Sequence, residues 1–94
     1  MHIDIDIDKT LINTNETANI VLKWQNFDLA AEKYIDDVNN NEMIVLSING
    51  TDYELMPEAG IAQAVFQSEI TGSFNLNVKN KAINFKPLEV IVDG

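Results

Sequence analysis

Hydrophobic and polar residues alternate along most of this chain, which is typical of β-strands buried on one face. The pattern is strictest over residues 3–8, where three isoleucines alternate with three aspartates. Other strand-like runs cover residues 18–25, 44–48, 51–55, 61–68, 73–79 and 83–92. Seven runs at this spacing predict a β-sandwich. Pro87 interrupts the last run, so that strand is expected to be an edge strand or to contain a bulge there.

The clearest local signal is the Asn49-Gly50 pair between two alternating runs. Both residues tolerate the positive φ of a type I′ turn, so the pair predicts a β-hairpin. In that hairpin Ile48 lies opposite Thr51, and the apolar residues of both runs share one face. A shift of one residue would set apolar residues opposite charged ones, so the pattern favours a single register.

The segment from Phe27 to Asn41 follows a different pattern. Its apolar residues recur at a spacing near 3.6, and strong helix formers lie between them. Asp28 is suited to cap a helix and the asparagines at 39–41 to end it. We therefore expect a short helix or compact loop near residues 28–38 that crosses between two sheets.

The composition is that of one small globular domain spanning residues 1–94. Fifteen acidic residues against six lysines give a net charge of −9, and no arginine is present. Such a surface repels nucleic acid. No apolar run is long enough for a membrane span, and the absence of cysteine excludes disulfides and thiolate metal sites.

Three short segments resemble bacterial immunoglobulin-like domains of the invasin/intimin type. They are the lysine-threonine start at residues 5–10, the glycine–apolar–alanine strand entry at 60–66, and the glycine–aromatic strand at 71–78. Such modules are repeated in bacterial surface proteins and occur in phage structural proteins. The resemblance implies an immunoglobulin-like antiparallel sandwich with a spacer, adhesion or decoration role and no catalysis. The chain departs from the family pattern at residues 27–41.

Two acidic clusters raise the question of calcium. Asp4, Asp6 and Asp8 lie along one strand face at intervals of about 6.6 Å, too far apart to share an ion, so we expect a solvated face. The second cluster, which includes Asp36, Asp37, Asn39 and Asn40, lies in a predicted loop where oxygens could converge. We expect no cofactor, with calcium at this second cluster as the alternative.

No residue pattern indicates an enzyme. Nucleophile motifs, paired metal-ligand histidines and glycine-rich phosphate loops are absent from the sequence, and His2 is expected to be a frayed terminal side chain. Trp24, Tyr53, Phe66 and Phe74 fall on predicted inward faces and are expected in the core.

The leading hypothesis is a non-catalytic structural or adhesion module of a bacterial surface or a phage particle. Its partner would be a protein or another component of that surface, and the oligomeric state is left open. No signal-peptide pattern opens the chain, which fits either one repeat of a long surface protein or a virion component. The alternative is a module that binds calcium or carbohydrate through residues 27–42. The residues expected to contact a partner are Phe27, Tyr34, Asp36, Asp37, Asn39 and Asn40.

Overall fold

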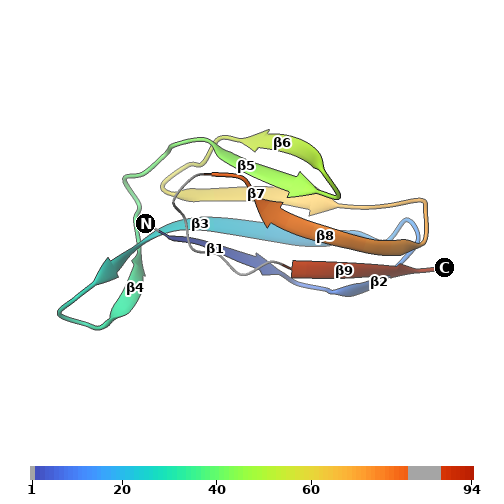
Figure 1. The fold of residues 1–94 in the computed structure, drawn as a ribbon, viewed down its shortest axis with the longest axis horizontal. Coiled ribbons are helices and arrows are strands. Elements are labelled where there is room, and N and C mark those ends of the chain that lie inside the picture. The colour runs from blue at the N-terminus through green and yellow to red at the C-terminus, as the bar shows by residue number, and fades with distance from the viewer. Residues whose placement is uncertain (1, 81–87) are drawn as a thin grey trace.

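The computed structural model describes residues 2–80 and 88–94, which form nine strands in two sheets (Figure 1). The first sheet contains β1 (His2–Ile7), β3 (Ala18–Asp28), β4 (Lys33–Asp36) and β7 (Ile61–Phe66). The second sheet has the order β2 (Leu11–Asn13), β9 (Leu88–Asp93), β8 (Gly72–Val78), β5 (Ile44–Ile48) and β6 (Thr51–Leu55). Among the described residues, no helix has the length and hydrophobicity needed to cross a membrane.

The core lies between the two sheets and is supplied by alternate residues of the strands. Ile20, Leu22 and Trp24 of β3 are buried, together with Leu46 of β5 and Leu76 of β8. Burial of these side chains removes apolar surface from water and is the main stabilising contribution to the sandwich. The expected two-sheet sandwich is confirmed.

The predicted hairpin at Asn49-Gly50 is also confirmed in its register. Ile48 pairs with Thr51, Leu46 with Tyr53, and Ile44 with Leu55. Asn49 and Gly50 have φ values of 49° and 86°, as a type I′ turn requires.

The short helix or compact loop expected near residues 28–38 is wrong, because most of this segment belongs to a β-hairpin. β3 continues to Asp28 and pairs with β4, so that Phe27 lies opposite Tyr34. Asp28 does accept hydrogen bonds from the N–H groups of Ala30 (2.9 Å) and Ala31 (3.4 Å), as a helix cap would. The chain then turns back through Glu32, whose φ is 54°, which ends any helical path.

The backbone hydrogen bonds of Trp24 show along which edge of β3 the strand β4 lies. The N–H of Trp24 donates to the Gly60 carbonyl (2.9 Å), and the Trp24 carbonyl accepts from the N–H of Asp37 (2.8 Å). Both groups of one residue point to the same side of a strand, so β4 continues along the edge of β3 that β7 occupies. The β3–β4 hairpin therefore projects beyond the rest of the sandwich (Figure 1).

Two strand features differ from the expectation. The short strand β2 was not predicted, and it pairs in parallel with β9 at Leu11–Ile91 through Asn13–Asp93. β9 thus lies between β8 and β2, so over residues 91–93 it is not an edge strand. Pro87, where an edge or a bulge was expected, lies outside the described residues.

Candidate functional site

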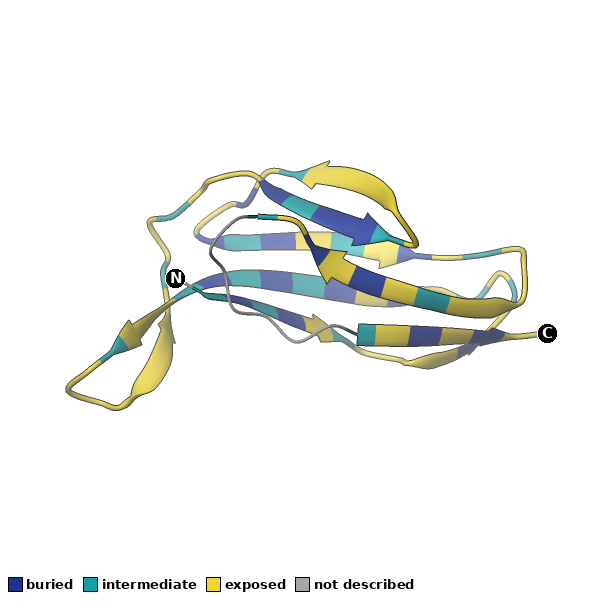
Figure 2. Ribbon diagram, viewed as in Figure 1, coloured by how far each residue is buried: buried dark blue, intermediate teal, exposed yellow. Residues whose placement is uncertain are grey.

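The projecting hairpin exposes an unusual number of apolar side chains. Their exposed fractions are 49% for Phe27, 83% for Leu29, 40% for Tyr34, 43% for Ile35 and 56% for Val38. We call these five residues the hairpin patch. All four residues of β4 are exposed, as Figure 2 shows. Because Phe27 pairs with Tyr34 and Asn26 with Ile35, apolar side chains occupy both faces of the hairpin.

The aromatic part of the patch is packed against the first strand. The rings of Tyr34 and His2 are stacked with centroids 4.3 Å apart, and Phe27 meets Tyr34 edge-on at 5.3 Å. His2 is therefore held in β1 by this contact, and the expectation of a frayed terminal side chain is wrong. The sequence contains no signal for this contact, because it depends on where β4 lies across the sheet.

Asp36 and Asp37, two of the residues expected to contact a partner, accept hydrogen bonds from side-chain amides of β3. Asp36 Oδ1 accepts from Gln25 Nε2 (3.0 Å), and Asp37 Oδ2 accepts from Asn26 Nδ2 (2.9 Å). Each bond joins β4 or its end to β3. These hydrogen bonds therefore stabilise the base of the hairpin.

The connection from Asp37 to Glu42 leads from the first sheet to the second. Its polar groups form hydrogen bonds between side chains and the backbone. Asn40 Oδ1 accepts from the N–H of Glu42 (3.0 Å), and Asn41 Oδ1 accepts from the N–H of Gly60 (3.1 Å). The Glu42 carbonyl accepts from Trp24 Nε1 (2.9 Å). Asn39 is exposed. Within residues 2–80 and 88–94, no group of three or more His, Cys, Asp or Glu side chains is placed to hold a metal ion.

The pKa values of two carboxyl groups are shifted near the end of β1 that lies away from the hairpin. The backbone N–H of Asn19 donates to Asp8 (2.8 Å), and this bond, with a side-chain bond from Asn19, lowers the pKa of Asp8. The N–H of Asn13 donates to Glu16 (3.0 Å) and, with Lys9 at 3.3 Å, lowers the pKa of Glu16. Both shifts favour the ionised carboxylate, whereas a general acid requires a raised pKa.

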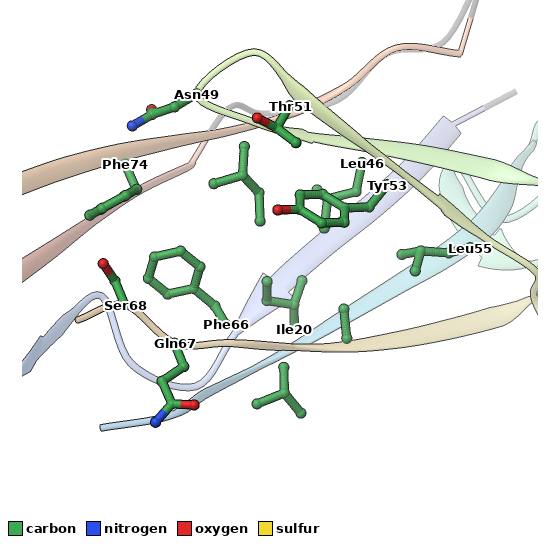
Figure 3. Close-up of a pocket in the computed structure, with 13 residues that line it drawn as sticks. Ile20, Leu46, Asn49, Thr51, Tyr53, Leu55, Phe66, Gln67, Ser68 and Phe74 are labelled. Carbon is green, nitrogen blue, oxygen red and sulfur yellow. The ribbon is translucent and has the colours of Figure 1, made fainter. Parts of the chain in front are cut away.

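A second candidate surface is an open groove between β6 and β7. It has a volume of about 370 Å³ and is lined mainly by apolar side chains, including Tyr53, Leu55, Phe66 and Phe74 (Figure 3). Tyr53 was expected in the core, but 48% of its surface is exposed. The reason is that β6 and β7 are both edge strands among the described residues, where no neighbouring strand covers the inward face of β6. Phe66 is buried, as expected, and Phe74 packs partly buried against the core.

Comparison with known structures establishes the fold. The chain is similar to the CARDB domain of the PF1109 protein from Pyrococcus furiosus. The crystal structure of that domain, in complex with di-metal ions, matches with a TM-score of 0.63 and 15% identity, covering 97% of this chain and 90% of that chain. Its solution NMR structure matches with a TM-score of 0.60 and 15% identity, covering 97% and 92%.

The fold is an immunoglobulin-like β-sandwich. At 15% identity the likeness extends to the fold alone. It does not point to the invasin/intimin type in particular, which stays a prediction. No protein-family model and no curated protein sequence gives a significant match to the chain.

Proposed function

We propose that this chain is a non-catalytic immunoglobulin-like module that binds a protein partner through the hairpin patch, with an adhesive or structural role on a bacterial surface or a phage particle. The observation that supports it is the exposure of five apolar side chains on the projecting hairpin and directly after it. Exposed apolar side chains gathered on one projecting element mark a candidate interaction site in soluble proteins.

A protein partner fits the patch better than a carbohydrate. Leu29, Ile35 and Val38 are aliphatic, and such side chains gain from burial against a protein rather than from contact with hydroxyl groups. A sugar platform also needs a free aromatic face, but one face of the Tyr34 ring is stacked on His2. This contact removes one face of Tyr34 from the aromatic surface that could stack on a sugar ring.

The calcium alternative finds less support. Asp36 and Asp37 already accept hydrogen bonds from Gln25 and Asn26. The described residues hold no cluster of three acidic or imidazole ligands. The di-metal ions belong to the Pyrococcus crystal structure, and at 15% identity they are not carried over to this chain.

The proposal is tested with a double variant of the patch, Leu29→Ser with Ile35→Ser. Ile70→Ser is the matched control, because Ile70 is 72% exposed and lies outside the hairpin. Changes at exposed positions alter stability by about 0.5 kcal/mol or less, so both variants should fold. In a pull-down from the cells or particles that contain the protein, the double variant should lose its partner while the control retains it. Equal retention by both variants would refute the role of the patch.

A further inference from the structure

The groove between β6 and β7 is bordered by two strand edges that no other described strand covers. Among the described strands, β6 is the last of its sheet, and β7 pairs only with β3. No ladder joins β6 to β7 in the described part of the chain. A free strand edge presents unpaired backbone N–H and C=O groups, which another chain can pair with.

The free backbone groups of β7 can be identified from its pairing. Trp24 and Gly60 form a hydrogen-bonded position, since the N–H of Trp24 donates to Gly60. Alternation along the same antiparallel pairing means that Ala62 and Ala64 bond to β3, while Gln63 and Val65 direct their N–H and C=O groups to the open edge. Ile61 points the same way, but its N–H and C=O groups are bonded to Glu58. The open edge therefore offers two successive pairing positions, Gln63 and Val65.

The groove beside this edge is shaped to receive side chains. Tyr53 and Leu55 form one wall, and Phe66 and the small Ala64 lie on the other side, as the close-up shows for the labelled residues (Figure 3). A volume of about 370 Å³ is within the usual range of ligand-binding clefts. A strand added at β7 would direct every second side chain into this space.

Among the described residues, no charged side chain lines the groove, and the attraction for an occupant comes from the net charge of the domain and from the acidic residues in and between the strands that border the groove. Residues 51–78, which include β6, β7 and β8, contain four acidic residues and no lysine. They are Asp52, Glu54, Glu58 and Glu69, of which Asp52 is paired with Lys79. A second copy of this chain, with net charge −9, would bring the same acids together and be repelled. A segment with basic residues is attracted.

We propose that the groove binds an extended segment of another protein, with apolar residues at alternate positions and basic residues between them, which adds as a strand to the free edge of β7. The backbone bonds at Gln63 and Val65 would supply affinity, and the groove would select the apolar side chains. This site is separate from the hairpin patch and does not depend on the function proposed for it.

The test uses a synthetic peptide of six residues, which matches the length of β7. It carries valine at alternate positions with lysine or threonine between them, and blocked ends. Titration monitored by NMR should show binding, with the largest amide shifts at Gln63 and Val65. The exchange of these two amides with solvent should slow when the peptide is bound, because both become hydrogen-bonded.

Two changes remove the backbone pairing, and a control substitution at Val65, which itself lines the groove, accounts for the loss of its side chain. Val65→Pro deletes an N–H that makes no bond within the sheet, so an edge strand tolerates it. This variant should bind at least about tenfold more weakly, whereas Val65→Thr, which keeps the N–H, should bind as the wild type does. If Val65→Pro proves unfolded, a peptide N-methylated at the residues facing β7 makes the same test on the unchanged protein.

Several results would overturn the proposal. These are no binding at millimolar peptide, equal binding of the N-methylated peptide, and equal binding of a peptide with glutamate in place of lysine. Amide shifts confined to the hairpin rather than to β7 would also overturn it.

Discussion

Gly60 contacts the core strand β3, the connection between the two sheets and the base of the hairpin. The effect of its replacement on stability can therefore be estimated from the structure. Its φ is +79°, and a Cβ built there overlaps the carbonyl oxygen of Asp37 and lies 3.3 Å from the Cα of Val38. Its N–H donates to Asn41 Oδ1 (3.1 Å), and its carbonyl accepts from the N–H of Trp24 (2.9 Å). Gly60→Ala must therefore displace the Asp37–Asn41 connection or lose these bonds.

Gly50→Ala is the matched control, because Gly50 has a φ of +86° and nothing within 4 Å of its Cβ position. Left-handed backbone costs an alanine about 1–2 kcal/mol at either site. Gly60→Ala adds the loss of one or both hydrogen bonds, about 0.5–1.5 kcal/mol each. The unfolded chain is affected equally by both changes, so it cancels in the comparison.

Urea unfolding followed by the fluorescence of Trp24 gives both free energies of unfolding. We expect Gly60→Ala to be less stable than Gly50→Ala by about 0.5–3 kcal/mol. Equal destabilisation of the two variants would show that the connection does not pack on Gly60, and the placement of the hairpin base would then be wrong.

Three further predictions follow from the described contacts. Trp24 is 1% exposed, so Trp24→Ala should cost about 3–5 kcal/mol, and native emission should be blue-shifted; red-shifted emission would contradict burial. Because the pKa of Asp8 is lowered in the folded state, its contribution to stability is present above its ordinary pKa and lost as the pH falls below about 4. Asp8→Asn should therefore flatten the acid side of the stability profile, and an unchanged profile would refute this. Millimolar Ca²⁺ should leave thermal unfolding unchanged, whereas a site at a hundredfold saturation would stabilise by about 2.7 kcal/mol.

The elements that were predicted correctly from the sequence are those whose pattern has one interpretation. The isoleucines of β1 alternate strictly, and Ile3 and Ile5 are buried. The Asn49-Gly50 turn permits one register, which the structure shows. Local pattern and fold agree in these segments, so the sequence alone is sufficient.

The hairpin was missed because its apolar residues fit two periods. Phe27, Tyr34 and Ile35 are spaced as on one face of a helix. In the structure, Phe27 and Tyr34 instead face each other across the hairpin, and Ile35 follows Tyr34 along β4. The pairing of β4 with the end of β3 decides between the two, and that pairing is a tertiary feature. Tyr53 was misplaced for a related reason. Its inward direction was predicted, but burial depends on a covering strand, and none of the described strands covers β6.

The central claim is that the hairpin patch contacts a protein partner, and site-specific photo-crosslinking tests it most directly. A photoreactive side chain would be introduced at Leu29, which is 83% exposed, and in a separate variant at Ile70, which is 72% exposed. Both variants would be produced in the cells or particles that contain the protein. We predict a discrete protein adduct from position 29 and none from position 70. No adduct at position 29, or the same adduct from both positions, would contradict the account.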